Sequence, residues 1–249
     1  MPYVAVTALS HAGLVREHNE DSLVIGPWTL CATVTDNPQT LVFPLGRPLV
    51  VAVADGLGGH PAGEVASALV VRRLSSLGHS LDGASALRDA VDLCNDEVYS
   101  AARGHPELTA MGTTVAGVLV LADSLLVFNV GDSKVYDAAP GGLRQVSVDD
   151  SPPPAPGQRT TSAVTQTLGG SRAFGAVTPH VATRTLSVGD RYLVCSDGLT
   201  DPVPDEEIDA LLRAGEDGRA AFALWKAAIE AGGPDNITLA LVRIGDDVG

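Results

Sequence analysis

The sequence has little lysine, few aromatic residues and no long apolar run. Only two of its 16 basic residues are lysines, and 30 acidic residues give a net charge of -14. Nucleic-acid binding needs basic side chains that neutralise phosphates, so this balance argues against a nucleic-acid partner. The longest apolar runs, such as residues 115–122, fall far short of the roughly 20 residues that span a bilayer. We therefore expect no membrane partner either.

Cysteines are also scarce, with Cys31, Cys94 and Cys195 far apart in the sequence. An odd number without a CxxC pair indicates neither a disulfide framework nor a zinc or redox site. We expect buried free thiols in a reducing compartment. The N-terminus lacks the charged start and apolar stretch of a signal peptide, so a cytoplasmic location is the default expectation.

Strand patterns are interrupted by two pairs of helical patterns. Strands are expected at residues 3–9, 49–54, 114–121, 124–130, 143–148, 181–186, 191–195 and 237–244. Helices are expected after Pro61, after Asp82 as a cap, and at residues 205–213 and 217–231. Because the helices come in adjacent pairs, the order does not fit a parallel α/β fold. It predicts an α+β fold in one domain over residues 1–249, with antiparallel sheets and helix pairs packed outside them. Residues 151–157 (SPPPAPG) predict an extended loop.

Four aspartates lie at the ends of these strands. Asp55, Asp132 and Asp197 each follow an apolar strand, and Asp235 precedes the last one. Taken singly, each also fits an ordinary turn. In antiparallel sheets, however, the end of one strand lies beside the start of its neighbour, so all four could share one rim.

Such a cluster of carboxylates repels itself unless a cation is present. Oxygen ligands without histidine or cysteine are typical of magnesium or manganese rather than zinc. Gly56, directly after Asp55, allows a close backbone approach and offers its carbonyl as a further ligand. The residues therefore predict a metal site lined by carboxylates.

A second charged segment, residues 16–21 (REHNED), follows the first strand. Arg16 could hold a phosphate through its planar fork of donors, and Glu20 and Asp21 add carboxylates to the site. The alternative is a solvated charged turn.

Six short sequence blocks follow one another along the chain. They are RxxNED at 16–21, VADGLGGH at 53–60 with GExAS at 63–67, MGTT at 111–114, VGDS at 130–133, GDRYL at 189–193 leading to CSDGLTD at 195–201, and DNIT at 235–238. From about residue 3 to 244 the chain closely resembles the type 2C metal-dependent Ser/Thr protein phosphatases (PPM family), particularly the bacterial type. The resemblance implies a four-layer αββα sandwich of two antiparallel β-sheets flanked by helix pairs, with a binuclear metal centre at one end.

The resemblance also implies roles at the matching positions. Asp55 would bridge two Mn²⁺ or Mg²⁺ ions, and the Gly56 carbonyl would bind one of them. Asp197 and Asp235 would hold the other ion, and Arg16 would clamp the substrate phosphate.

Further residues would complete this site. Glu20 and Asp21 would orient metal-bound waters, and a water that bridges the two metals would attack the phosphorus. Asp132 and Asp201, with Asp197, match a weaker third metal position of the family.

The sequence departs from the family pattern at two places. Leu57 stands where many eukaryotic members have a histidine after the Asp-Gly pair, and His60 lies three residues on. His60 is a candidate proton donor to the leaving group, or a structural residue at the start of a helix. The second departure is a short, proline-rich segment at about residues 149–163, where bacterial relatives carry a longer flap. Its shortening predicts a more open site or one completed by a partner.

Three function classes are compatible with these residues. The first is a phosphatase for phosphoserine and phosphothreonine in proteins, with phosphorylated proteins as substrates. A Ser/Thr kinase or a phosphothreonine-binding scaffold as a partner follows from the family alone. The second is a binuclear-metal phosphoesterase for small phosphoesters or nucleotides. The third, an inactive binding module, would be expected to lack a metal-binding aspartate, yet Asp55, Asp197 and Asp235 are all present.

Overall fold

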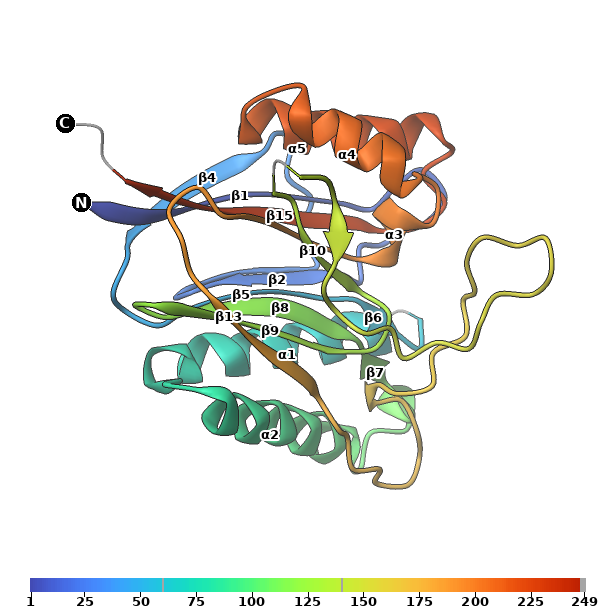
Figure 1. The fold of residues 1–249 in the computed structure, drawn as a ribbon. Coiled ribbons are helices and arrows are strands. Elements are labelled where there is room, and N and C mark those ends of the chain that lie inside the picture. Colours follow the sequence, from blue (N-terminus) through green and yellow to red (C-terminus); the bar gives the residue numbers. More distant parts are fainter. Residues whose placement is uncertain (60, 140, 247–249) are drawn as a thin grey trace.

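The two ends of the chain pair with each other in one β-sheet. Strand β1 (Pro2–His11) runs antiparallel to β15 (Ile237–Asp246), with Pro2 opposite Asp246 and His11 opposite Ile237. The structure is a computed structural model that describes residues 1–59, 61–139 and 141–246. The start of β1 and the end of β15 lie on the same side of the fold (Figure 1). Residues almost the whole sequence apart are therefore joined at the centre of the sheet.

This first sheet has six antiparallel strands in the order β11-β10-β14-β15-β1-β4. Its remaining strands are β4 (Gln39–Pro44), β10 (Lys134–Asp137), β11 (Arg144–Gln145) and β14 (Arg191–Cys195).

The second sheet also has six antiparallel strands, in the order β13-β9-β8-β5-β2-β3. They are β2 (Ser22–Ile25), β3 (Trp28–Cys31), β5 (Leu49–Ala54), β8 (Val115–Val120), β9 (Ser124–Val130) and β13 (His180–Thr185). A small third sheet joins β6 (Gly56–Leu57), β7 (Gly112–Thr113) and β12 (Leu168–Gly169).

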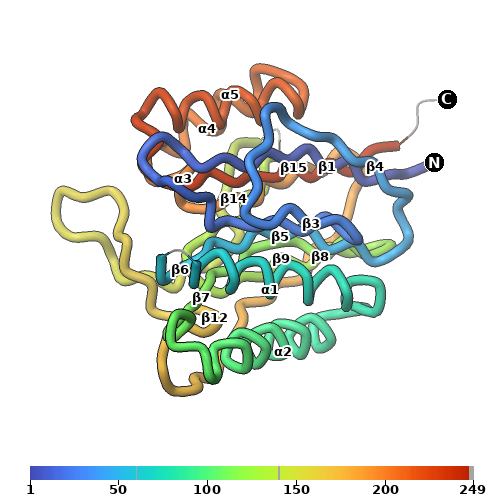
Figure 2. Tube along the Cα trace, turned by 180° about the vertical axis from the view of Figure 1, so that it is seen from behind, coloured from blue at the N-terminus to red at the C-terminus, as the bar shows by residue number. Residues whose placement is uncertain are grey.

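Two helix pairs cover the outer faces of the large sheets (Figures 1 and 2). Helices α1 (Ala62–Leu77) and α2 (Ala84–Ala102) pack on the second sheet, and α4 (Asp205–Arg213) and α5 (Asp217–Glu230) pack on the first. A single turn, α3 (Asp197–Thr200), follows β14, and two 3₁₀ turns cover Gly78–Ser80 and Pro106–Leu108. The predicted four-layer αββα sandwich is confirmed.

Burial on both faces explains why the central strands are continuously apolar. In β5, Val50 and Ala52 pack against the helix pair, whereas Val51 and Val53 pack against the opposite sheet. Successive side chains of a strand point to opposite faces, so a strand between two apolar layers needs apolar residues at every position. The three layers of core hold the strand ends, and with them the site loops, in fixed positions.

Three local predictions need correction. Helix α2 begins at Ala84 after Gly83, and no side chain caps it, so the expected Asp82 cap is wrong. The strand expected at 143–148 shrinks to Arg144–Gln145 at a sheet edge. Cys31 is only partly buried, although Cys94 and Cys195 are buried free thiols as expected.

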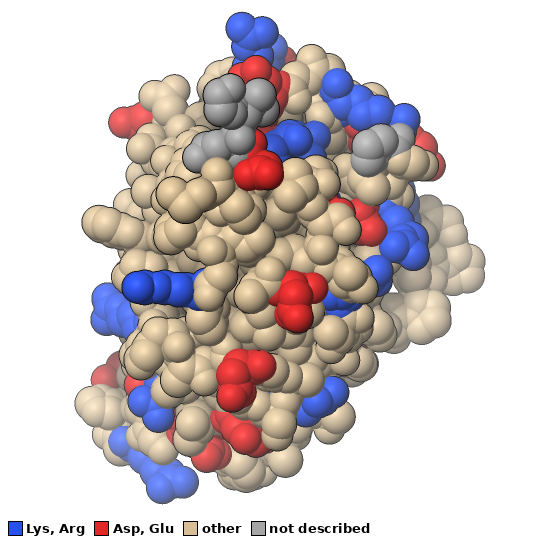
Figure 3. Space-filling view, turned by 60° about the vertical axis from the view of Figure 1, so that its left-hand side comes forward, with Lys and Arg blue, Asp and Glu red and all other residues tan. Residues whose placement is uncertain are grey.

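The loop prediction for residues 151–157 is confirmed, because no helix or strand lies between β11 and β12. This segment projects from the body at the end where β6 and α3 lie (Figure 1). On the face turned away from it, acidic and basic side chains are interspersed (Figure 3). In the described part of the chain, no helix is both long and apolar enough to cross a membrane.

Candidate metal centre

The strand-end aspartates come together in one cavity. Asp55 directly follows β5, Asp132 lies in the β9–β10 turn, Asp197 begins α3 after β14, and Asp235 precedes β15. All four line a cavity of about 180 Å³ at one end of the sandwich. The cavity is completed by Arg16, Glu20, Gly56, Leu57, Gly58, Gly59, Ser162, Val164 and Asn236. The predicted shared rim is therefore present.

The backbone of Asp55 is fixed by the threonine pair at β7. Thr113 Oγ1 donates to the Asp55 carbonyl (2.7 Å), and the Thr114 amide donates to the same carbonyl (2.9 Å). The Asp55 amide in turn donates to Thr114 Oγ1 at 3.2 Å. Thr114 Oγ1 also lies 2.7 Å from Ser133 Oγ, which ties Asp55 to the turn that carries Asp132.

Gly56 is required by close backbone packing beside Glu20. A Cβ atom at Gly56 would lie 2.4 Å from the Gly63 carbonyl oxygen and 2.6 Å from the Glu20 carbonyl oxygen. Any side chain at position 56 would push these backbone segments apart. The Asp-Gly pair after β5 therefore has a packing reason that the turn interpretation alone does not supply.

A similar contact places Asp197 against the segment that carries Asp235. A Cβ atom at Gly198 would lie 1.9 Å from the Asn236 carbonyl oxygen. Ser196, which directly precedes Asp197, donates a hydrogen bond from Oγ to Asp21 Oδ2 at 2.8 Å. This hydroxyl bridges the end of β14 to the segment after β1, two parts of the chain that are far apart in sequence.

Asn236 binds the residues 12–20 segment to the start of β15. Its Oδ1 accepts the Glu20 amide at 2.8 Å, and its Nδ2 donates to the carbonyls of Ala12 (3.0 Å) and His18 (2.8 Å). Asn19 acts similarly, because its Nδ2 donates to Ser10 Oγ at 2.8 Å. These asparagines carry no charge and follow no periodic pattern. In the sequence, only their positions in the Asn-Glu-Asp and Asp-Asn blocks indicate that they belong to the site.

Burial and mutual repulsion make the carboxyl groups hard to ionise. Desolvation raises the pKa of Asp21 to about 7 and that of Asp197 to about 8, and neighbouring aspartates add to both shifts. Desolvation, followed by the charges of Asp21 and Asp197, also raises the pKa of Asp55 well above its ordinary value. The pKa of Asp132 rises to about 6, and that of Asp201, which follows α3, also rises, mainly through burial. Lys134 lowers the pKa values of Asp132 and Asp201 only in part, so the cluster lacks enough positive charge to keep it ionised.

Arg16 is the only basic side chain among the described residues that line the cavity. Its Nη2 atom lies 2.7 Å from Asp235 Oδ2, and its side chain is exposed. The structure thus places Arg16 at the mouth of the site, where it pairs with one of the carboxylates. His60, the candidate proton donor, lies outside the described residues.

The donor set fits divalent metal ions. Asp21 Oδ1 and Asp197 Oδ1 are buried and have no hydrogen-bond partner among the described residues. All the candidate ligands are oxygens, as hard cations prefer. In the described part of the chain, no three His, Cys, Asp or Glu side chains are yet arranged to hold an ion. The carboxylates line one cavity without forming a complete ligand shell among the described residues.

The sequence model of the protein phosphatase 2C family matches residues 39–233. The chain belongs to this family. It is 34% identical over 254 residues to the serine/threonine protein phosphatase PstP of Mycobacterium tuberculosis, covering 96% of this chain and 45% of that protein. The chain therefore spans less than half the length of PstP. It is 30% identical to the serine/threonine phosphatase stp of Listeria monocytogenes, covering 93% of this chain and 92% of that protein.

Solved structures agree with this membership. The catalytic domain of PstP in complex with two manganese ions superposes with a TM-score of 0.80 at 32% identity, over 99% of this chain and all of that one. The serine/threonine phosphatase Stp1 from Staphylococcus aureus gives a TM-score of 0.79 at 27% identity, over 97% of this chain and 95% of that one. The 2C phosphatase fold therefore extends over nearly the whole chain.

Proposed function

We propose that this chain is a metal-dependent protein phosphatase that hydrolyses phosphoserine and phosphothreonine, and that residues 1–249 form one phosphatase unit. The observation that carries the proposal is a cavity with five carboxylates, Glu20, Asp55, Asp132, Asp197 and Asp235, and Arg16 at its mouth. Family membership and the manganese complex of PstP support the same assignment.

In this proposal, Asp55 would contribute to both of two Mn²⁺ or Mg²⁺ sites, the Gly56 carbonyl would contribute to one of them, and Asp197 and Asp235 would hold the other ion. Two such ions supply an acidified water as nucleophile and neutralise charge on the phosphoryl group. The support for these positions is the buried, partnerless Asp197 oxygen and the contact of Gly198 with residue 236.

The remaining residues orient water and substrate. Glu20 and Asp21 are proposed to orient metal-bound waters. For Asp21 the support is that one carboxylate oxygen has no partner among the described residues while Ser196 fixes the other. Arg16 is proposed to exchange Asp235 for the substrate phosphate, which presents two oxygens to its planar fork. Asp132 and Asp201, with Asp197, remain the proposed third and weaker metal position, and His60 remains a proposed proton donor.

The natural substrates are proposed to be phosphorylated proteins. A Ser/Thr kinase or a phosphothreonine-binding scaffold as a partner rests on the family resemblance alone, as does a cytoplasmic location. Two residues of the proline-rich segment, Ser162 and Val164, line the cavity, so a substrate bound there would also contact this segment.

Turnover of a phosphothreonine peptide and of a cyclic nucleotide, each with Mn²⁺, with Mg²⁺ and with EDTA, tests the proposal. We expect peptide turnover with either metal and none with EDTA. Asp197→Ala should lower kcat by about a hundredfold or more, because charge stabilisation by the ions is worth several kcal/mol. Asp123→Ala, in the exposed β8–β9 turn at the other end of the sandwich, is the matched control and should be unaffected. Activity that survives EDTA, or faster turnover of the cyclic nucleotide, would contradict the proposal.

A further inference from the structure

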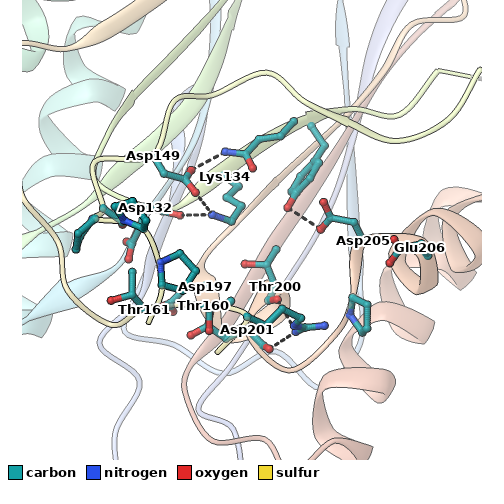
Figure 4. A pocket seen from close by; sticks show the side chains of 18 residues that line it. Asp132, Lys134, Asp149, Thr160, Thr161, Asp197, Thr200, Asp201, Asp205 and Glu206 are labelled. Carbon is teal, nitrogen blue, oxygen red and sulfur yellow. Dashed lines mark hydrogen bonds and ion pairs between the residues drawn. The ribbon is translucent and has the colours of Figure 1, made fainter. Parts of the chain in front are cut away.

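A larger groove of about 540 Å³ adjoins the metal cavity. The two share Asp132 and Asp197 as lining residues, so the groove begins where the phosphate is proposed to react. Its walls come from the β9–β11 region, the proline-rich loop, and the segment from α3 to the start of α4 (Figure 4). A volume of this size lies within the roughly 300–1,000 Å³ of typical ligand sites. The proposed two-metal chemistry uses the smaller cavity, and the groove shares with the proposed third metal position only Asp132, Asp197 and Asp201, so most of the groove has no role yet.

Two buried hydroxyls in the groove lack partners. Thr200 is only 5% exposed, and its Oγ1 makes no hydrogen bond to any described residue. Ser151, from the proline-rich loop, is only partly buried, but its Oγ is buried and also lacks a partner among the described residues, and both residues line the groove. Buried polar atoms are ordinarily hydrogen-bonded, so these two indicate a ligand with its own donors or acceptors. A polypeptide backbone supplies both.

Arg159 holds the loop over this groove. Its Nη2 atom donates to the Thr200 carbonyl at 3.2 Å and also to the Asp201 carbonyl. Cations are favoured at the carbonyl end of a helical turn. The other basic residue of the groove, Lys134, is paired with Asp149. Both cations are therefore engaged within the protein.

The acidic residues at the outer end of the groove are not neutralised in this way. Asp205 and Glu206 begin α4 and are exposed, and neither pairs with Lys or Arg in the part of the chain that the structure describes. Among the described residues, the Asp205 carboxylate accepts a single hydrogen bond, from the Tyr136 hydroxyl at 3.1 Å. Acidic residues also stabilise the first turn of a helix. Glu207 shares that first turn and is equally exposed, but it does not line the groove.

We propose that this groove binds the substrate polypeptide on one side of the phosphorylated residue and selects an arginine or lysine there through Glu206 and Asp205. The inference rests on the proposed phosphatase function and adds its sequence preference. The hydroxyls of Thr200 and Ser151 bind the peptide backbone, and the two acids bind the basic side chain.

The test compares phosphothreonine peptides whose flanking residues are alanine except for one arginine or one glutamate, placed in turn on either side. Ratios of kcat/KM within one enzyme remove differences in overall activity. The wild type should prefer arginine over glutamate by about fivefold to tenfold on one side only, since each exposed charge pair is worth a few-fold. Glu206→Lys should abolish or invert this ratio, and the matched Glu207→Lys should keep it. The preference should also shrink at high salt.

Two results would overturn the inference while the phosphatase function stands: equal turnover of the arginine and glutamate peptides by the wild type, or equal changes in the ratio for both lysine variants. The second result would mean that net charge or the helix terminus, and not the groove, sets the preference. If no peptide is hydrolysed, including the all-alanine one, the proposed function itself fails.

Discussion

Removing the metal ions should make the stability of the protein depend on pH in an unusual direction. The pKa of Asp197, at about 8, and that of Asp21, at about 7, lie far above the ordinary aspartate value because burial disfavours their charged forms. The folded metal-free protein therefore binds more protons than the unfolded chain between pH 6 and 8. The free energy of unfolding must then fall as the pH rises through this window.

The magnitude follows from the two raised values. Between pH 6 and pH 8, a group with a folded pKa near 8 loses about 2 kcal/mol of stabilisation, and one near 7 loses about 1 kcal/mol. Because the charge of Asp21 also raises the pKa of Asp197, the two losses are not independent. We expect the EDTA-treated protein to be less stable at pH 8 than at pH 6 by on the order of 2 kcal/mol.

Urea unfolding at pH 6, 7 and 8, in EDTA and in saturating Mg²⁺, measures this effect. The Asp197→Asn variant in EDTA is the matched control, because it keeps every histidine and removes one titrating carboxyl. Its stability should change less with pH, and at pH 8 it should exceed that of the metal-free wild type. A wild-type profile in EDTA that is flat or rises with pH would refute the electrostatic reasoning.

Two further predictions concern residues that support the fold and the site. Asn236→Ala removes three hydrogen bonds from a buried side chain, including the one from the Glu20 amide, and should lower the free energy of unfolding by about 3 kcal/mol and weaken Mn²⁺ binding in calorimetry. Asp217→Asn removes the partner of Arg191 and Arg243 and should cost about 2–3 kcal/mol at pH 7 in urea unfolding. Burial raises the pKa of Asp217, but hydrogen bonds and charge from the two arginines outweigh this and lower it, so the wild-type advantage should be full at pH 7 and shrink below about pH 4. An Asn236→Ala protein with unchanged stability, or an Asp217→Asn penalty that grows on acidification, would contradict these expectations.

The elements that the sequence predicted well are those buried on a regular face. Strand β5 is continuously apolar because it packs against core on both faces. Helix α1 has apolar residues at helical spacing because it packs against core on one face only. Both elements were predicted to within a residue or two. Strands β3 and β4 were not predicted, because they lie at sheet edges and most of their residues are not buried. The α2 start was misplaced because Asp82 and Gly83 are both suitable residues before a helix, and periodicity does not choose between them.

At the candidate site, the sequence predicted which carboxylates meet but not what holds them. Asp55, Asp197 and Asp235 were recognisable because each adjoins a buried strand, and strand ends meet at one rim. The hydrogen bonds of Asn236 and Ser196 join segments that are far apart in sequence, and no local pattern encodes such pairs. Their distances, and the large groove beside them, required the folded chain.

The choice of supporting residues explains why this site depends on cations. Ser196, Thr114 and Asn236 orient the acidic segments through neutral hydroxyl and amide groups, which fix geometry without adding positive charge. Had lysine or arginine done the same work, their charge would lower the carboxyl pKa values and satisfy the cluster within the protein. Among the described residues, the exposed Arg16 is the only basic side chain that forms an ion pair with a carboxylate of the cavity, and its partner is Asp235 at the cavity mouth. Asp55, Asp132 and Asp197 are therefore held in place without an ion-pair partner among the described residues, which is the condition under which divalent ions bind and a dianionic phosphate can follow them.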